Sequence, residues 1–391
     1  MKVAVVYYQL TPEGGGVHTF TQSIHAALRA AEGDSQHEFV YYATPTAEGP
    51  PPGVIMMPAG KLAAAQKRTI HRLRDAQDRL GAPRMGPATW FERSLNEHGV
   101  EMVWFATNYS EDCDQPFIFT VFDVEHARQP WFPEVSAGGE WERRHYYFSR
   151  YIPKATRVIV PNEAGREQVE RYWRIEPDRF LLLGHPTPEF ALDAGAQTPP
   201  ARDALDRHGV GERYLLYPAQ FWAHKNHATL FDALALLEPG YELVLVGSDK
   251  GQLDHHRRLA ADAGVGDRVQ FLGFVETEDL IALYRHAHAL TYVSLFGPEN
   301  LPPLEAMAIG CPVVAADVPG AREQLGDAAL LVPPLDPAAV AEAVRRLADE
   351  RLRGELVATG RRVAAERTAA GYVGGVMAFL DEFAGIRKGW S

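Results

Sequence analysis

Short apolar runs alternate with helix-like stretches along almost the whole chain, and few folds accommodate that order. The strand-like runs are 3–8, 38–42, 101–106, 117–122 and 157–161 in the first half, and 214–219, 242–247, 269–273, 289–293, 311–316 and 328–333 in the second. The helix-like stretches between them are 17–30, 61–80, 138–152, 226–237, 251–263, 277–287 and 336–348. Runs that are apolar throughout are typical of parallel strands with both faces covered. We therefore predict an α/β fold with parallel sheets.

The length of the chain and one segment rich in Pro, Gly and Ala predict two domains. A single hydrophobic core rarely extends beyond about 250–300 residues, and this chain has 391. The segment 184–212 lies between two halves of domain size. We expect an N-terminal domain over 1–190 and a C-terminal domain over 191–367. The remaining stretch, 368–385, has apolar spacing but several glycines, so we expect it to need support from another element.

The net charge and the cysteine content limit the binding partners and the cellular compartment that we expect for this protein. The net charge of −12 argues against non-specific nucleic-acid binding, which depends on clustered Lys and Arg. Two cysteines, Cys113 and Cys311, form no disulfide framework, so we expect a reducing, cytoplasmic setting. The N-terminal apolar run is too short for a signal peptide, and no run approaches the roughly 18 apolar residues of a membrane span. A peripheral position at the inner face of a membrane stays open.

Loops that follow predicted strands carry the side chains best suited to a ligand, because ligands of open α/β sheets bind at the carboxyl ends of the strands. The loop 11–20 places Gly15 and Gly16 before a predicted helix, where a ligand can approach the backbone and the helix N-terminus favours anions. A dinucleotide fingerprint is not completed, since position 19 is Thr19. The simpler alternative is a tight turn.

The loop 218–230 carries a lysine at a predicted helix start. Lys225 precedes Asn226, the expected cap of that helix. A cation beside free backbone N–H groups suits a pyrophosphate, although a solvated lysine is the plainer reading. His224 and His227 have the spacing of metal ligands, but no Cys or carboxylate cluster adjoins them, which argues against zinc.

The loop 294–309 combines rigid residues with two carboxylates. Pro302 and Pro303 favour the first turn of a helix. Glu305 lies one turn into that helix and Glu299 lies in the loop, so both carboxylates can accept hydrogen bonds from sugar or ribose hydroxyls. A glutamate at a helix start is often only a partner of the helix dipole. Two carboxylates in a stiffened loop after a strand favour a binding site.

The segment NLPPLEAMAIGCPVVAADVPGAREQLGDAALLVPPLDP, 300–337, resembles the donor-site signature of glycosyltransferase family 4. The resemblance is dense over 213–350 and traceable over essentially the whole chain. It implies a retaining enzyme with the GT-B fold, in which two Rossmann-like domains with parallel sheets face a central cleft and 368–385 packs back on the N-terminal domain. It also implies metal-independent transfer of a hexose-type sugar from a GDP- or UDP-sugar to a hydroxyl of a saccharide, lipid-linked or small-molecule acceptor, without a cofactor.

The resemblance also assigns residues to roles. The glutamate matching Glu305 would hold the ribose, and the lysine matching Lys225 the diphosphate. The expected donor-binding residues are Gly15, Gly16, Gln220, Lys225, Gly247, Ser248, Phe274, Val275, Glu299, Asn300, Leu301 and Glu305. The loop 121–134 resembles the family segment D-L-x-H-x-x-x-P that faces the donor sugar. From it we expect catalytic roles for Asp123 and His126, together with Lys225, and acceptor binding by Trp131 and Phe132.

Two positions depart from the family pattern, and one motif is typical of a different glycosyltransferase fold. The usual E-x7-E would place a glutamate at position 297, which is Gly297 here, so we expect the carboxylate of Glu299, or the adjacent amide of Asn300, to face the donor sugar instead. Gln220 stands where the family has arginine. Asp112 and Asp114 form an Asp-x-Asp pattern, which binds divalent metal in the other large glycosyltransferase fold. We expect a surface turn without metal there.

Two other classes share this architecture. A nucleotide-sugar epimerase would turn over the donor without an acceptor, and a non-catalytic nucleotide-sugar binding protein would bind the donor without turnover. Neither accounts as well for a glycine-rich loop and an aromatic pair on the N-terminal side.

Overall fold

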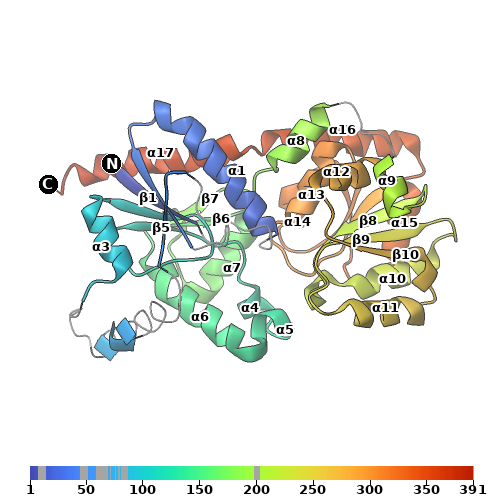
Figure 1. Ribbon diagram of the computed structural model, residues 1–391, viewed down its shortest axis with the longest axis horizontal. Helices are drawn as coiled ribbons and strands as arrows, with labels where there is room; N and C mark the ends of the chain where they lie inside the picture. The colour runs from blue at the N-terminus through green and yellow to red at the C-terminus, as the bar shows by residue number, and fades with distance from the viewer. Residues whose placement is uncertain are drawn as a thin grey trace.

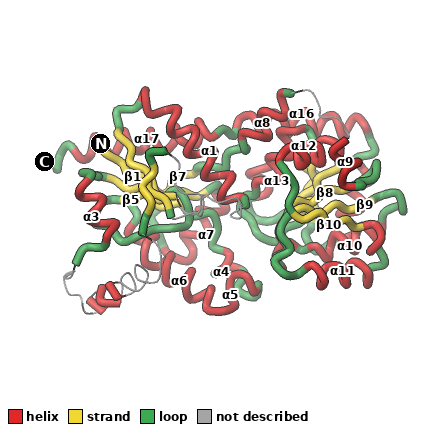
Figure 2. The backbone as a smooth tube through the Cα atoms, viewed as in Figure 1, coloured by secondary structure: helices red, strands yellow, loops and turns green. Residues whose placement is uncertain are grey.

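The structure is a computed structural model that describes residues 1–7, 15–44, 52–58, 69, 70, 72–74, 76, 77, 80, 87–197 and 203–390, and of residues 203 and 204 only the backbone. Two α/β domains lie side by side along the long axis of the molecule (Figure 1). In each domain the strands lie between helices, as Figure 2 shows. The predicted helical stretch 61–80 falls mostly outside the described residues.

The N-terminal sheet is parallel and has the strand order β3-β2-β1-β4-β5-β6-β7. Its strands are β1 (Lys2–Tyr7), β2 (Glu38–Ala43), β3 (Val54–Met56), β4 (Met102–Phe105), β5 (Phe117–Thr120), β6 (Arg157–Val160) and β7 (Phe180–Leu182). The α-helices described around them are α1 (Gly16–Ala31), α3 (Trp90–Glu97), α4 (Glu125–Arg128), α5 (Pro133–Ser136), α6 (Glu140–Tyr151) and α7 (Glu163–Trp173). Strand β4 is buried throughout, which explains why its sequence lacks polar alternation.

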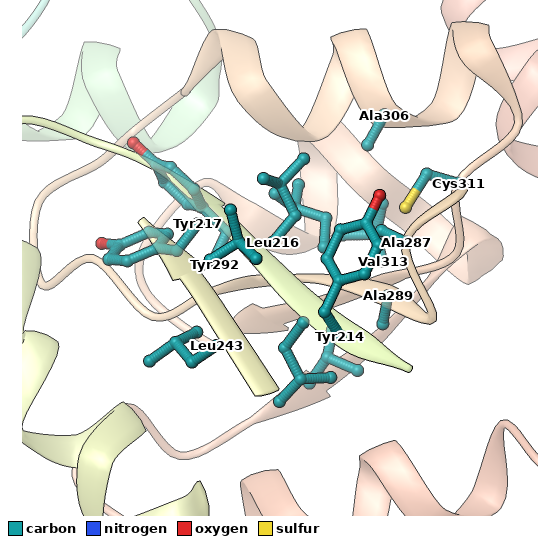
Figure 3. Close-up of a cluster of buried hydrophobic side chains, with 14 of the residues drawn as sticks. Tyr214, Leu216, Tyr217, Leu243, Ala287, Ala289, Tyr292, Ala306, Cys311 and Val313 are labelled. Atoms are coloured by element: carbon teal, nitrogen blue, oxygen red, sulfur yellow. The ribbon is translucent and has the colours of Figure 1, made fainter. Parts of the chain in front are cut away.

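The C-terminal sheet is also parallel, with the order β10-β9-β8-β11-β12-β13. Its strands are β8 (Tyr214–Pro218), β9 (Glu242–Val246), β10 (Val269–Gly273), β11 (Ala289–Tyr292), β12 (Val313–Ala316) and β13 (Ala329–Val332). The α-helices are α8 (Glu189–Ala196), α9 (Asp203–His208), α10 (His227–Leu236), α11 (Leu253–Asp262), α12 (Thr277–His286), α13 (Leu301–Ile309), α14 (Ala321–Leu325), α15 (Pro337–Arg346) and α16 (Glu350–Glu366). Figure 3 shows part of the core, where Tyr214 and Leu216 of β8 pack with neighbouring strands and α13.

Each predicted apolar run coincides with a strand, so the predicted α/β fold with parallel sheets is confirmed. In both sheets the strand order reverses at one place, between β1 and β4 and between β8 and β11. Loops that leave the carboxyl ends of strands beside such a reversal diverge, and ligands of doubly wound folds bind there. The loops carrying Gly15, Lys225 and Glu299 all follow these strands.

The last helix, α17 (Ala369–Arg387), packs on the N-terminal domain although it follows the C-terminal one (Figure 1). Thr368 caps it by accepting a hydrogen bond from the backbone N–H of Gly371 at 3.0 Å. Tyr372 and Val376 share a buried cluster with Phe20 and Ile24 of α1. This contact with α1 supplies the support that a glycine-containing helix needs. The boundaries 1–190 and 191–367 stay predictions.

Candidate active site

The loops at the carboxyl ends of the two sheets touch one another between the domains. Gln129 of the N-terminal domain donates to the carbonyl oxygen of Leu295 at 2.8 Å. Asn162 caps α7 with its side-chain oxygen and donates with its amide nitrogen to the carbonyl of Pro298 at 3.1 Å. The backbone N–H of His224 donates to Glu134 at 2.8 Å. The predicted donor loops therefore lie against the N-terminal domain.

The glycine loop meets the C-terminal domain at two predicted donor residues. Gly15 is the N-cap of α1 and has φ 57°, a conformation that glycine adopts without strain. A Cβ added at Gly15 would lie 3.4 Å from Nε2 of Gln220, and one at Gly16 would lie 3.6 Å from Cδ1 of Leu301. The start of α1 is thus brought to the β8–α10 loop and to the start of α13. Residues 11–14 of the predicted loop lie outside the described residues.

Lys225 is fixed by a short chain of hydrogen bonds. Its Nζ donates to the hydroxyl of Tyr292 at 2.9 Å, and that hydroxyl donates to Oδ1 of Asn300 at 3.0 Å. Asn226 follows with φ 60° and makes no capping bond for α10. Asn226 thus occupies the N-cap position of α10 as predicted, but its side chain donates to the carbonyl of Pro334 at 2.6 Å instead of accepting from a backbone N–H of the helix. Two predicted donor residues, Lys225 and Asn300, are therefore connected through Tyr292.

The remaining predicted donor loop residues gather beside Gln220. The N–H of Phe221 donates to the carbonyl of Ser248 at 3.0 Å, and Gly247 has φ 130°. A Cβ at Gly247 would lie 3.0 Å from the carbonyl oxygen of Ala219, so a side chain there would force the two loops apart. Beyond them Phe274 is exposed and the adjacent Val275 is half-buried. Because the backbone N–H of Gly247 also donates to the carbonyl of Gly273 at 2.7 Å, the loops at the carboxyl ends of β8, β9 and β10 contact one another.

Glu305 is a buried carboxylate in the first turns of α13. Its Oε2 accepts a hydrogen bond from the hydroxyl of Tyr284 at 2.6 Å. Burial raises the pKa of Glu305 to about 7, although the bond from Tyr284 lowers it. Ionised Glu305 therefore gains from any further hydrogen-bond donor, such as a ligand hydroxyl.

The carboxylate of Glu299 is bonded to residues outside the predicted donor set. Its carboxylate accepts from the backbone N–H of His185 at 2.7 Å and from Arg367 Nη1 at 2.8 Å, and its side chain is 0% exposed. Burial raises the pKa of Glu299, and the guanidinium of Arg367 opposes that rise. These contacts lie where the chain passes between the domains. The expectation that Glu299 faces a sugar in place of a glutamate at position 297 therefore has no support in this geometry.

His126 lies inside the N-terminal domain. Its ring is fully buried and packs near Trp141, Phe148 and Trp173, at centroid distances of 6.4, 5.2 and 6.1 Å. Burial lowers its pKa to about 4, so the ring is neutral at pH 7. Both ring nitrogens lack a hydrogen-bond partner among the described residues. The predicted catalytic role of His126 is therefore not supported, because an aromatic shell surrounds the ring.

In the loop predicted to face the donor sugar, Asp123 caps a short helix, and its neighbour Glu125 approaches the C-terminal domain. Asp123 accepts from the backbone N–H of Glu125 at 3.0 Å and so stabilises the start of α4. Glu125 itself is fully buried, accepts from Arg128 at 2.7 Å, and lies 3.5 Å from the backbone nitrogen of Gly297. Burial raises the pKa of Glu125 to about 7. Sequence reasoning missed Glu125, although it lies in the same predicted loop as Asp123.

The two aromatic residues predicted to bind the acceptor differ in exposure. Phe132 packs edge-on against Phe296 across the domain boundary, with centroids 5.2 Å apart. Phe296 in turn stacks on His224 at 3.8 Å. Phe132 is therefore part of the contact between domains. Trp131, by contrast, is 69% exposed and presents an accessible ring beside that contact.

The Asp-x-Asp pattern lies at the surface only in part, since Asp114 is exposed in a bend whereas Asp112 is buried. Asp112 is buried and accepts from Arg74 at 3.2 Å, Arg150 at 3.0 Å and Tyr151 at 3.0 Å. Arg74 also forms an ion pair with Glu92 at 2.7 Å. The expectation for Asp112 was wrong because its partners lie far away in sequence. In the described part of the chain no group of three or more His, Cys, Asp or Glu side chains is placed to hold a metal ion.

None of the helices in the described residues has the length and apolar character required to cross a bilayer.

The segment that carries the C-terminal site loops is similar in sequence to known proteins. Residues 205–363 match the family of glycosyl transferases group 1. O-antigen chain mannosyltransferase RfbU of Salmonella typhimurium is 31% identical over 35% of this chain and 38% of its own length. O-antigen chain mannosyltransferase B of Escherichia coli is 34% identical over 54% of this chain and 56% of its own. The chain thus spans roughly 38–56% of the length of these relatives.

Solved structures extend the likeness to nearly the whole chain. Sucrose-phosphate synthase from Thermosynechococcus elongatus has a TM-score of 0.72 at 22% identity and covers 98% of this chain and 100% of its own. HepE of Anabaena, in complex with UDP-glucose, has a TM-score of 0.67 at 15% identity, covering 98% and 100%. At these identities the likeness concerns the fold. The protein therefore has the GT-B fold, and its C-terminal half is similar in sequence to glycosyl transferases group 1.

Proposed function

We propose that this protein transfers a hexose-type sugar from a nucleotide diphosphate sugar, either a GDP- or a UDP-sugar, to a hydroxyl of a saccharide, lipid-linked or small-molecule acceptor. One observation carries the proposal. At the carboxyl ends of the two sheets the start of α1 lies against Gln220 and Leu301, and in the same two loops Lys225 is joined to Asn300 through Tyr292. Similarity to O-antigen mannosyltransferases supports a saccharide acceptor.

The nucleotide would be held by the C-terminal domain. Glu305 is a buried carboxylate whose ionised form gains from hydroxyl donors, and the two ribose hydroxyls are such donors. Phe274, which is exposed at the end of β10, offers a surface for the base. The HepE structure in complex with UDP-glucose supports a nucleotide-sugar ligand for this fold.

The diphosphate would lie between Lys225 and the start of α1. Lys225 supplies a positive charge that Tyr292 orients. The first turn of α1 contains no acidic residue, so its N–H groups and its dipole favour an anion. Gln220 adds an uncharged side chain at the same place, with its Oε1 accepting from Trp222 Nε1 at 2.7 Å. These groups would stabilise the charge that develops on the departing nucleoside diphosphate.

The acceptor would enter from the N-terminal side, where Trp131 presents an exposed ring. We further propose retention of configuration at the sugar, following the family resemblance. No protein nucleophile is assigned, because His126 is enclosed and Glu125 is held by Arg128 and Gln129. We propose that the reaction needs no metal, since Lys225 and backbone N–H groups supply the positive field.

The experiment is acceptor-dependent release of nucleoside diphosphate from UDP-glucose and from GDP-mannose. The first step is a thermal-shift screen with both donors, because a bound ligand raises the melting temperature by mass action. Release that requires an acceptor, forms a new glycoside and persists in EDTA supports the proposal. Donor conversion without acceptor would indicate an epimerase, and binding without turnover would indicate a binding protein. Loss of activity in EDTA that returned with Mg²⁺ would overturn the metal-independent reading.

A further inference from the structure

In the described part of the chain, the backbone passes between the two domains at two places, and these crossovers are hydrogen-bonded to each other. The first leads from β7 to α8 and contains His185 and Thr187, and the second joins α16 to α17 at Arg367. The N–H of Thr187 donates to the carbonyl of Arg367 at 2.8 Å. The hydroxyl of Thr187 donates to the carbonyl of Ala364 at 2.8 Å. Any change in the angle between the domains must act on this joined pair of segments.

Glu299 connects the joined crossovers to the loop that follows β11. One carboxylate oxygen accepts from His185 N–H on the first crossover, and the other accepts from Arg367 on the second. The Glu299 side chain is 0% exposed and that of Arg367 is 20% exposed. Gly184 permits this approach, since a Cβ there would lie 2.6 Å from Nη1 of Arg367. Removing one member of such a buried pair leaves the other charge uncompensated.

The same junction touches both sides of the proposed site. Glu299 immediately precedes Asn300, which accepts from Tyr292 in the hydrogen-bond chain that begins at Lys225. On the other side, the ring of His185 packs edge-on against Phe20 of α1 and Phe122 beside Asp123, with centroid distances of 5.6 and 5.3 Å. The crossovers are thus in contact with the donor loop, with α1 and with the β5–α4 loop.

We propose that Glu299 and Arg367 form a latch that positions the loop 295–300 for sugar transfer by fixing it to the crossovers between the domains. Glu299 is a positioning residue in this account, not a ligand of the sugar. The account rests on the proposed function of the site. With the latch closed, Asn300 and Lys225 are held opposite the start of α1. With the latch broken, the loop and the angle between the domains vary independently, and fewer molecules hold both halves of the site together.

The kinetic test uses Glu299→Gln, Arg367→Gln, the double variant and the conservative Arg367→Lys. For each single Gln variant we expect kcat to fall by about 10- to 100-fold, as misplacement of reacting groups does, with UDP affinity nearly unchanged in calorimetry. The double variant should lose about as much as either single one, because the two residues act through one contact. Arg367→Lys should retain more activity than Arg367→Gln. Arg351→Gln, in the exposed pair with Glu355 on α16, is the matched control.

Hydrogen exchange tests the latch without relying on activity. Glu299→Gln should speed exchange at the His185 amide and across 295–300 together, while the control leaves both unchanged. Unaltered exchange in 295–300, or full activity of the single variants, would overturn the proposal. A loss confined to UDP-glucose affinity would instead make Glu299 a donor ligand. If the wild type transferred no sugar, the proposed function would fail, while the exchange result would still decide whether the latch exists. If Glu299→Gln does not fold, Arg367→Gln carries both measurements.

Discussion

Replacing Glu305 with glutamine tests whether its carboxylate binds the ribose of the donor or only supports the fold. Glutamine keeps the size of the side chain and one acceptor oxygen for Tyr284, but it removes the charge. A hydrogen bond to a charged group contributes about 1.5–3 kcal/mol. Loss of that contribution corresponds to about 10- to 150-fold weaker binding of UDP or GDP. The melting temperature without ligand should not fall in proportion, because the charged carboxylate is itself costly to bury.

The pH dependence sharpens this prediction. Burial raises the pKa of Glu305 to about 7, so the free protein is mostly protonated at pH 6 and mostly ionised at pH 8. Ribose hydroxyls favour the ionised form, and binding therefore releases a proton. Affinity for UDP-glucose should rise about tenfold from pH 6 to pH 8, in proportion to the ionised fraction. Without ligand, a rise in pH instead lowers the stability of the folded protein. Stability is greatest below the ordinary pKa of a glutamate and falls by about 3 kcal/mol as pH rises through 7.

The assay is calorimetry with UDP-glucose and GDP-mannose at pH 6, 7 and 8, because their diphosphates do not titrate in this range. Glu342→Gln, at an exposed position on α15, is the matched control. The Glu305→Gln variant should bind weakly and show a flat pH profile, whereas the control should behave as the wild type. Equal affinity of wild type and variant at pH 8 would refute the role assigned to Glu305.

Three further substitutions test other parts of the structure. Lys225→Ala should reduce kcat/KM by about 2–4 kcal/mol of transition-state stabilisation with little change in melting temperature; near-normal transfer would remove Lys225 from the site. Asp112→Asn should destabilise the protein by about 3–5 kcal/mol, because Arg150 loses its buried carboxylate partner and Arg74 loses one of its two, and thermal unfolding with Asp114→Asn as the comparison checks this. Glu125→Gln should raise the melting temperature relative to wild type more at pH 8 than at pH 5, since the buried carboxylate with pKa about 7 must ionise over that range. An equal difference at both pH values would show that Glu125 does not titrate there.

The sequence predicted the fold well because the signals for it are local. An apolar run such as 3–8 indicates a strand that is buried on both faces. Gly15 indicates a turn with positive φ, a conformation that other residues rarely adopt. The position of Lys225 before a helix likewise follows from its neighbours in the chain. Such features are fixed within a few residues and need no knowledge of distant partners.

The direction of buried polar side chains was not predictable in the same way. His126 matched a motif, but its ring is enclosed by Trp141 of α6 and Trp173 of α7, which come later in the chain. Glu299 was assigned to a sugar because its eventual partner, Arg367, lies 68 positions away. Such contacts depend on how the elements pack, and a motif spacing carries no record of them.

The most direct test of the account is a single transfer assay on the intact protein. Purified chain is incubated in EDTA with UDP-glucose or GDP-mannose, with and without a mixture of mannose-containing oligosaccharides, and free nucleoside diphosphate and new glycoside are measured together. The account predicts that at least one donor yields both products in equal amounts only when acceptor is present, and that Lys225→Ala strongly slows the formation of both. Nucleotide binding with no glycoside formed from either donor, over a broad acceptor set, would contradict it.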